Sequence, residues 1–318
     1  MASSNLAELN SIEKGNQDYL RGLEYLQTSC IKCRYKPNYL DAIPFFKKAA
    51  ELFRGCGQFE KEVQTRELLV RCFKAEKSYW EEGNEHQKMC QTQINQLKNI
   101  PGAKTSIINS FNAFVAYRTY DDGIKAITKA SNFFIDNNNK AEAEEILQFA
   151  FDGVEKYYHV ITMNEEESHY YIYECIDKYI DLLFDREKYS KSAEISQKAA
   201  NIIKEEKNDE KEKICKYYGF WALSELMNKN NNKYQEIVEK GMDIDNSSDN
   251  LCSKINKLVN IVNQKDKENE KLIKKLYSEI ARNVPSSMAR VVNIKYVQVY
   301  IVKAEDEINT NDDEDDMK

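Results

Sequence analysis

The sequence predicts an all-α protein built as a solenoid of helical hairpins, and three observations support this. Gly and Pro number only 10 and 4 among 318 residues, whereas sheets joined by tight turns need many of both. Hydrophobic residues make up 42% of the chain, which is enough for a long core and too much for wholesale disorder. Apolar residues also recur at helical spacing along most of the chain. An all-β fold is therefore excluded, and nucleotide folds with glycine-rich loops are disfavoured.

The clearest helical pattern lies between Tyr39 and Phe59. Its apolar residues form one helix face, and they are Tyr39, Ala42, Ile43, Phe46, Ala49, Ala50 and Phe53. The small alanines on this face let a neighbouring helix approach closely. Pro44 is tolerated if Asp41 is the N-cap and Pro44 lies in the first turn, whereas a start at Asn38 implies a kink.

This pattern occurs twice more along the chain. The copies begin at Tyr120 and Tyr189, 81 and 150 residues after Tyr39. Each has Tyr first, then a small residue three positions later, an apolar residue next to it and Ala at the tenth position after Tyr. A looser copy begins at Tyr234. The pattern is typical of the second helix of tetratricopeptide-like pairs, and it predicts a tetratricopeptide-like helical-hairpin solenoid, that is, a twisted helical sheet.

Short polar runs mark the expected breaks between helices. They are Cys56-Gly57, Glu82-Gly83-Asn84, Pro101-Gly102, Asp136 to Asn139, Asn164 to Glu167, Asn228 to Asn232 and Asp245 to Asp249. No linker is long enough to separate independent domains, so we expect one continuous helical-repeat domain over residues 1–304. Met288 to Val302 is rich in β-branched residues, but it has no strand to pair with, and we expect a closing helix there.

The negative charge is concentrated in the C-terminal tail, residues 305–318. This tail has eight acidic residues and one basic residue, so it carries the whole net charge of −7 while the rest of the chain is neutral. It cannot bury apolar area, and we expect it to be flexible. It is either an interaction segment or a solvated tail that only aids solubility.

The chain shows no targeting or membrane-spanning pattern. Met1 to Asn16 is polar and lacks the apolar segment of a signal peptide. No apolar stretch approaches the roughly 20 residues of a membrane span. The eight cysteines are scattered, and we expect them to be reduced thiols in helix packing. Together these features predict a cytoplasmic protein.

Residue patterns for catalysis and metal binding are weak. Cys30 and Cys33 form a single Cys-x-x-Cys pair, and His86 and Cys90 lie one helical turn apart. Structural zinc normally has two ordered ligand pairs at short spacing. Phosphate-binding glycine loops and a Gly-x-Ser-x-Gly motif are absent. We expect no catalytic residue, metal, cofactor or nucleic-acid partner, and a binding function.

The segment from Cys30 to Lys36 differs in composition from its surroundings. Its candidate membrane-contact residues are Cys30, Ile31, Lys32, Cys33, Arg34, Tyr35 and Lys36. Apolar groups beside cations suit the surface of a bilayer and would give weak, reversible contact. The alternative is a packed loop whose lysines extend into water.

Residues 20–85 contain an ordered set of short motifs. These are Tyr25-Leu26-Gln27-Thr28, Lys36-Pro37-Asn38-Tyr39 with Ala42, Lys48-Ala49-Ala50 with Phe53, and Gln58-Phe59-Glu60. In this order the sequence resembles the soluble NSF attachment protein (SNAP) family, most closely its gamma form. The chain end, from Asp312 to Met317 and Lys318, is similar to the acidic end of the family, where the alpha form has leucine in place of Met317.

The resemblance implies a cytosolic adaptor, peripherally associated with membranes, in vesicle-mediated transport between the ER and Golgi, intracellular protein transport and membrane fusion. Its partners would be the SNARE four-helix bundle, the AAA+ ATPase NSF and, weakly, the membrane surface at the Cys30 to Lys36 loop. The ATPase contact would be made by Asp312, Asp313, Glu314, Asp315, Asp316 and Met317.

Lys125 and Lys129, one turn apart on a repeat helix, are weak candidates for SNARE contact, with a solvated helix face as the alternative. The alternative function is a tetratricopeptide-like scaffold subunit of another multiprotein complex.

Overall fold

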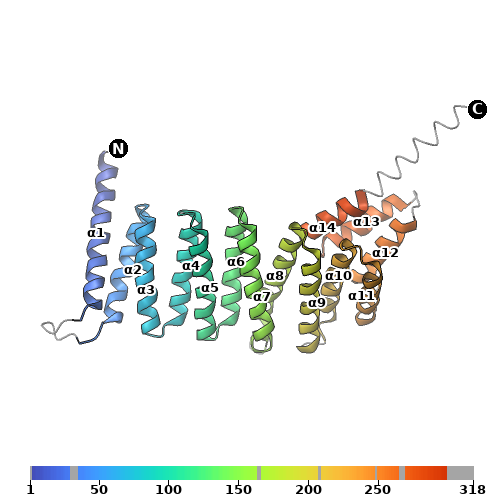
Figure 1. Cartoon of the computed structure of the whole chain (residues 1–318), viewed down its shortest axis with the longest axis horizontal. Coiled ribbons are helices and arrows are strands. Elements are labelled where there is room, and N and C mark those ends of the chain that lie inside the picture. The colour runs from blue at the N-terminus through green and yellow to red at the C-terminus, as the bar shows by residue number, and fades with distance from the viewer. Residues whose placement is uncertain are drawn as a thin grey trace, which may run out of the picture. The chain divides into compact units, whose positions relative to one another are not determined.

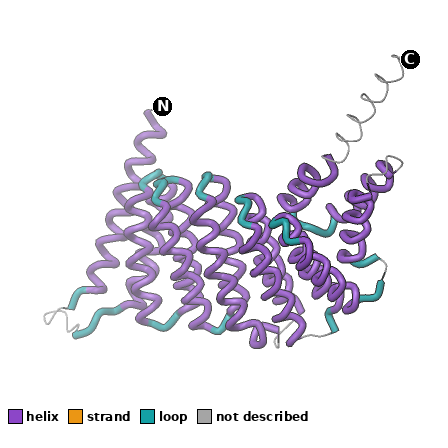
Figure 2. Tube along the Cα trace, turned by 45° about the vertical axis from the view of Figure 1, so that its right-hand side comes forward, coloured by secondary structure: helices purple, strands orange, loops and turns teal. Residues whose placement is uncertain are grey.

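The structure is a computed structural model. It describes residues 2–28, 35–162, 166–206, 209–247, 249–264 and 269–298. These residues form fourteen α-helices and one short π-helix, with no strand among them (Figures 1 and 2). Adjacent helices pack as hairpins. The predicted all-α helical solenoid is therefore confirmed for the described part of the chain.

The chain divides into two compact units, Met1–Cys175 and Ile176–Lys318. The prediction of one continuous domain over residues 1–304 stays a prediction. Unit 1 contains α1 (Ala2–Leu26), α2 (Tyr39–Gly55), α3 (Phe59–Ala75), α4 (Tyr79–Asn95), α5 (Ile100–Tyr117), α6 (Tyr120–Asp136), α7 (Lys140–Thr162) and the first half of α8 (Glu166–Asp185).

Alternate helices of unit 1 form two layers. From α1 to α7 each helix packs on its neighbours in the chain, and in addition α4 contacts α6 and α5 contacts α7. One layer therefore holds α2, α4 and α6, and the other holds α3, α5 and α7. The α1–α2 connection and the α3–α4 and α5–α6 turns lie along one edge, at the bottom of Figure 1, and the other turns lie along the opposite edge.

Helix α2 shows how its sequence sets its start. Asn38 is the N-cap, and its Oδ1 accepts a hydrogen bond from the Asp41 amide at 3.1 Å. Of the two starts that the sequence leaves open, the structure has the one at Asn38. Pro44 lies inside the helix and removes the amide that would pair with the Leu40 carbonyl. Leu40 and Pro44 are both exposed, so water can satisfy that carbonyl.

The repeated apolar faces are buried as their spacing predicts. The buried residues of α2 are Ala42, Phe46, Ala49, Ala50 and Phe53, and those of α6 include Gly123, Ile124, Ile127, Ala130 and Phe134. The rings of Phe46 and Phe53 reach α1, where the missing side chains of Gly22 and Gly15 leave room for them.

Two predicted breaks lie inside helices: Pro101-Gly102 is in the first turn of α5, just after the true turn, and the other is further from its turn. Glu82, Gly83 and Asn84 lie inside α4, and the turn precedes them at residues 76–78. Gly83 serves packing, because an added Cβ would lie 2.9 Å from the ring of Phe114 in α5. A glycine that admits a neighbouring ring and a glycine that ends a helix are indistinguishable in a single sequence.

Unit 2 contains the second half of α8, α9 (Tyr189–Glu206), α10 (Lys211–Met227), α11 (Asn231–Ile244), α12 (Leu251–Gln264), α13 (Glu270–Ala281), α14 (Ser286–Val292) and the π-helix η2 (Asn293–Gln298). Helix α10 contacts α9, α11 and α12 and is buried on nearly every side from Ile214 to Leu226. Such all-round burial marks it as the centre of this unit.

The C-terminal helical end of unit 2 returns to α8 and the start of α9. The Ser287 amide donates to Asp181 Oδ1 at 2.6 Å, and Arg290 pairs with Asp185 at 2.7 Å. Lys295 Nζ donates to the Tyr189 hydroxyl at 3.0 Å. The closing helix predicted for residues 288–302 is thus observed to Gln298, with its last turn of the π type. Residues 299–318, including the acidic tail, lie outside the described residues.

Candidate binding surfaces

A groove lies between α2 and α4 in unit 1, and α3 forms its floor. Its volume is about 460 Å³. Arg66 and Phe73 line the floor, Lys47 and Glu51 line the α2 side, and α4 contributes Trp80, Glu81, Asn84, Glu85, Gln87, Lys88 and Gln91. The groove is polar along α4, with one aromatic side chain at the helix start.

Arg66 anchors the floor of this groove. Its side chain is 1% exposed and donates to three carboxylates: to Glu62 at 2.8 Å, to Glu85 at 2.5 Å and to Glu51 at 2.9 Å. We call these four residues the Arg66 cluster. Each glutamate comes from a different helix, so the cluster ties α2, α3 and α4 together. Its residues come together only when the helices pack.

The environment of the Arg66 cluster keeps its charges paired. Burial disfavours the guanidinium charge, but Glu85, Glu51 and Glu62 outweigh it and raise the pKa of Arg66. Burial also opposes the charge of Glu51, yet its hydrogen bond to Arg66 leaves the pKa of that carboxyl lowered. Arg66 and Glu51 thus each favour the charged form of the other, and their contact is an ion pair.

Two further side chains complete the hydrogen bonds of the buried glutamates. Thr92 Oγ1 donates to Glu62 Oε2 at 3.2 Å, and Lys88 Nζ donates to Glu85 Oε1 at 2.7 Å. Lys88 extends from this network to the surface, where it is half-exposed. The network thus continues from the floor of the groove to its rim.

Both predicted SNARE-contact lysines lie on α6, in the same layer as α2 and α4. Lys129 is exposed. Lys125 Nζ lies 4.1 Å from the ring centroid of Tyr171 in α8, and its hydrogen bond to Tyr171 raises the pKa of Lys125. A cation–π contact at such a site contributes about 0.5–1 kcal/mol. Lys129 is therefore the freer of the two for a partner.

The structure adds two lysines that sequence reasoning missed. Lys48, Lys88 and Lys129 are each the tenth residue of their helix, in α2, α4 and α6 respectively. We call these three residues the lysine row. The signal in the sequence is the tyrosine that begins each of these helices, Tyr39, Tyr79 and Tyr120; the wrongly placed break at Gly83 concealed it at Tyr79.

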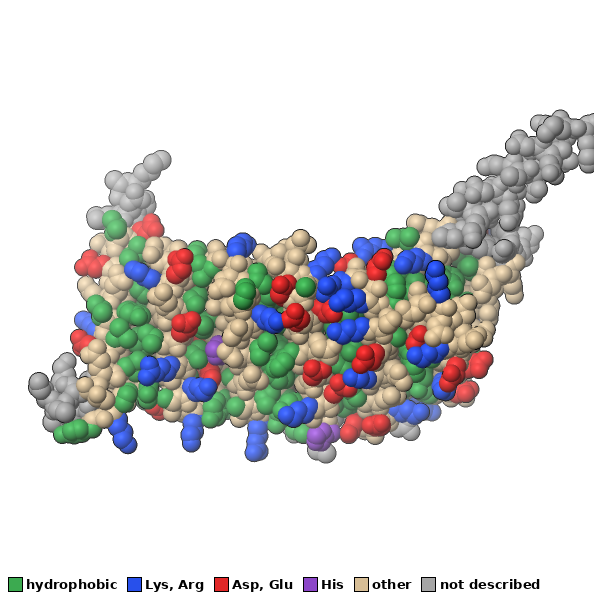
Figure 3. Space-filling model, in the orientation of Figure 1, with side chains coloured by type: hydrophobic (Ala, Val, Ile, Leu, Met, Phe, Trp, Pro, Cys, Tyr) green, Lys and Arg blue, Asp and Glu red, His purple; other side chains and the backbone are tan. Residues whose placement is uncertain are grey.

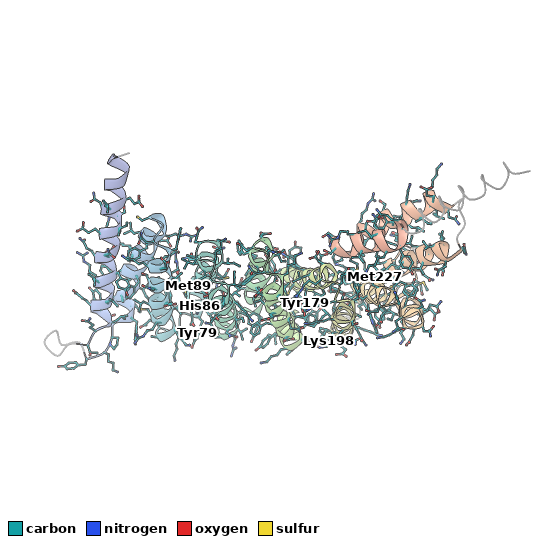
Figure 4. The ribbon with its side chains drawn as sticks, turned by 45° about the horizontal axis from the view of Figure 1, so that its top comes forward. Tyr79, His86, Met89, Tyr179, Lys198 and Met227 are labelled. Carbon is teal, nitrogen blue, oxygen red and sulfur yellow. The ribbon has the colours of Figure 1, made fainter. Side chains whose placement is uncertain are left out.

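The weak zinc candidates His86 and Cys90 lie on α4, where Figure 4 shows Tyr79, His86 and Met89 along the helix. Both are buried. Burial and then Lys74 lower the pKa of His86 to about 4, and burial raises the pKa of Cys90 to about 12. Cys30 and Cys33 lie outside the described residues. Across the described part of the chain, no group of three or more His, Cys, Asp or Glu side chains is placed to hold a metal ion.

Unit 2 has its own groove, of about 400 Å³, beside the turns that follow α11 and α13. Its charged lining residues are Glu212, Lys213, Lys216, Asp245, Asp249 and Arg282. Cys215 also lines it, and Cys252 donates to the Cys215 carbonyl at 3.5 Å. None of the cysteines described here forms a disulfide, and all but the half-buried Cys56 are buried in helix packing, as predicted.

The other predicted site residues are only partly described. Tyr35 and Lys36 are exposed, whereas Cys30, Ile31, Lys32, Cys33 and Arg34 lie outside the described residues. The same holds for the candidate ATPase-contact residues from Asp312 to Met317. The structure therefore neither gathers these residues into a site nor separates them.

The fold and its surfaces define a class: an all-α protein of helical hairpins with polar grooves lined by charged side chains. No helix in the described ranges is both long enough and apolar enough to cross a membrane. No protein-family model matches the chain, and no curated protein matches it.

Proposed function

We propose that this chain is an adaptor that binds assembled SNARE complexes and recruits the AAA+ ATPase NSF, which then disassembles them by ATP hydrolysis. The process served is vesicle fusion and intracellular protein transport. The proposal is supported by the resemblance of residues 20–85 to the SNAP family and by the acidic run before Met317 and Lys318. In unit 1, most of the resembling residues belong to α1, α2 and the turn into α3.

The observation that carries the proposal is the lysine row in the layer formed by α2, α4 and α6. Neighbouring packed helices lie about 8–10 Å apart, so Lys48, Lys88 and Lys129 repeat along a line that crosses the helices. A rod of parallel helices with acidic surface residues offers charges along a similar line. Such charge pairing speeds association and sets orientation more than it adds affinity.

The proposal divides the remaining work between the two termini. The loop at Cys30 to Lys36 provides a weak peripheral contact with the membrane and raises the local concentration of the adaptor near membrane-anchored SNAREs. The acidic tail contacts basic residues of the ATPase, and this contact weakens as salt rises. ATP hydrolysis belongs to the ATPase.

The test is recruitment of NSF to immobilised SNARE complex, with and without the chain, at two salt concentrations. The parent chain is expected to recruit NSF, and to do so less well at high salt. Deletion of Asp312 to Lys318 should abolish NSF recruitment while SNARE binding persists. Full recruitment by the deleted chain would remove the tail from the mechanism.

The same assay tests the lysine row. The double variant Lys48→Glu and Lys129→Glu should lower SNARE binding by roughly tenfold or more, because it reverses two charges on one surface. Its matched control is Lys14→Glu with Arg71→Glu, which reverses two exposed cations on α1 and α3. Equal loss in both variants would contradict a specific surface. If the folded parent recruits nothing, the adaptor function is wrong and a helical-repeat scaffold remains.

A further inference from the structure

The two edges of unit 1 differ in what they expose. One edge carries the connection before α2, the turns into α4 and α6, and the start of α8; we call it the lower edge, from its place in Figure 1. The opposite edge carries the turns into α3, α5 and α7. Both edges are built from the ends of the same helices, so each serves as a control for the other.

The lower edge gathers most of the exposed large apolar side chains of unit 1. They are between 46% and 76% exposed and come from the α1–α2 connection, the starts of α2, α4 and α8 and the end of α5: Tyr35, Leu40, Trp80, Tyr117 and Tyr170. Side chains in helices point back toward the N-terminus. Leu40 and Trp80, each the second residue of its helix, therefore point toward this edge.

The opposite edge is polar, and polar side chains there hydrogen-bond to one another and to the backbone. Neither its three turns nor the helix ends beside them, residues 54–61, 94–102 and 134–142, hold an exposed large apolar residue. Instead Lys98 Nζ donates to Asn137 Oδ1 at 2.9 Å, and Asn137 donates to the Phe133 carbonyl at 2.8 Å. The contrast shows that the apolar lower edge is not a general consequence of ending helices at a surface.

Charge on the lower edge places cations outermost. Lys36, Lys77 and Arg118 are exposed in the connections, and Figure 3 shows Lys and Arg side chains projecting from this edge. Glu76 is exposed as well, but Lys74 and Lys77 flank it. Asp41, in the first turn of α2, is exposed too, whereas the first-turn acids of α4 and α6 are buried or half-buried.

Two of these first-turn acids are shielded from water. Glu82 is buried and Asp122 is half-buried, and burial raises the pKa of both carboxyls. As first-turn residues they also complement the positive ends of α4 and α6. The exposed residues of the connections and first turns are therefore more cationic than acidic, and they lie beside the aromatic side chains.

We propose that the whole lower edge of unit 1 rests on a phospholipid bilayer surface, with Trp80 and Tyr170 seated at the headgroup level beside Tyr35. Trp and Tyr side chains gather at membrane–water interfaces because they join an apolar body to a polar tip. Lysine and arginine beside them pair with anionic headgroups, each adding a small attraction. A protein partner is the competing occupant, and the test below separates the two.

This contact would place the helices of unit 1 with their ends on the membrane and their axes pointing away from it. The lysine row then faces sideways, where it is accessible to a partner anchored in the same membrane. The inference extends the membrane contact of the proposed function beyond the Cys30 to Lys36 loop. It needs neither SNAREs nor NSF.

The direct test uses fluorescence of Trp80. The chain has two tryptophans, and Trp221 is buried in unit 2, so the full-length Trp221→Phe variant leaves Trp80 as the sole reporter. Vesicles of phosphatidylcholine and phosphatidylserine should shift its emission to shorter wavelength, and lipids brominated on their acyl chains should quench it. Flotation with the vesicles but unchanged Trp80 emission would confine the contact to the loop and overturn the proposal.

The mutational test uses flotation of the full-length chain with the same vesicles. Trp80→Ser with Tyr170→Ser should lower the vesicle-bound fraction by roughly tenfold, since two rings lose interfacial burial. The control Leu9→Ser removes an exposed apolar side chain of unit 1 from α1, away from the lower edge, and should bind as the parent does. Circular dichroism checks that each variant is folded. Parent-like flotation of the double variant would refute the contact between the lower edge and the bilayer.

The two proposals fail separately. Flotation is measured with no SNARE or NSF present, and NSF recruitment is measured on soluble SNARE complex with no membrane. A chain that floats through its lower edge but recruits no NSF keeps the inference and loses the function. A chain that recruits NSF but whose Trp80 emission does not change with vesicles keeps the function and loses the inference.

Discussion

Arg66 is the centre of a buried ionic network in unit 1. It is among the largest fully buried side chains of the protein, and its guanidinium joins carboxylates of α2, α3 and α4. Taking a charge out of water is costly, and a buried ion pair repays that cost only when its geometry is good and its remaining hydrogen bonds are made. Thr92 and Lys88 supply those bonds to Glu62 and Glu85.

The Arg66→Met variant tests this arrangement. It leaves Glu62 and Glu85 buried without their cation, so the free energy of unfolding should fall by about 3–5 kcal/mol. Urea denaturation followed by circular dichroism measures the change. Arg71→Met, at an exposed position of α3, should change stability by less than about 0.5 kcal/mol.

The triple variant Arg66→Met, Glu62→Leu and Glu85→Leu should recover part of the lost stability, because no unpaired charge remains buried. If Arg66→Met costs no more than the Arg71 control, the cluster is not a source of stability.

At the scale of elements, the packing of α5, α6 and α7 depends on one ring and two glycines. The ring of Phe111 in α5 would lie 2.9 Å from a Cβ added at Gly123 and 2.6 Å from one added at Gly153. Real Cβ contacts are essentially never shorter than 3.0 Å. The absence of two side chains therefore lets three helices pack around the same phenylalanine. Glycine lowers helix propensity at each position by about 1 kcal/mol relative to alanine, and the packing must offset that loss.

The Gly153→Ala variant weighs these two effects. Propensity alone would stabilise α7 by about 1 kcal/mol, but overpacking a core typically costs 1–3 kcal/mol, and we expect a net loss of about 1 kcal/mol by urea denaturation. Gly55→Ala is the control, since nothing lies within 4 Å of its added Cβ, and it should be neutral or stabilising. A gain in stability for Gly153→Ala would show that the ring moves aside at little cost.

At the scale of the whole molecule, the question is whether the two units fold together. The boundary falls between Cys175 and Ile176, which are consecutive residues inside α8. No loop therefore separates the units in the chain. Helical-repeat proteins owe their cooperativity to interfaces between neighbouring repeats, and the sequence predicts such a continuous array over residues 1–304.

The two tryptophans test this prediction, because Trp80 belongs to unit 1 and Trp221 to unit 2. The Trp221→Phe and Trp80→Phe variants each report the unfolding of one unit by fluorescence. A continuous cooperative array predicts that urea midpoints from the two probes coincide with the midpoint from circular dichroism. Midpoints that differ between the probes, after correction for the stability of each variant, would indicate two domains.

Local regularities determined the fold class. Helical periodicity and the scarcity of Gly and Pro act within a few residues of the chain, so the all-α fold and the buried faces of α2, α6 and α9 follow from the sequence alone. The closing helix after Pro285 is also predicted by the sequence, because its β-branched segment has no strand to pair with in an otherwise helical chain.

The tertiary structure decided the rest, because the features concerned join residues far apart in the chain. Gly83 belongs inside α4 because of the ring of Phe114, thirty-one positions away. Arg66 meets Glu51 and Glu85 only after three helices cross. Trp80, Tyr117 and Tyr170 share an edge only because successive helices reverse direction. A single sequence shows which residues can form a helix, but the contacts between helices depend on how the helices pack.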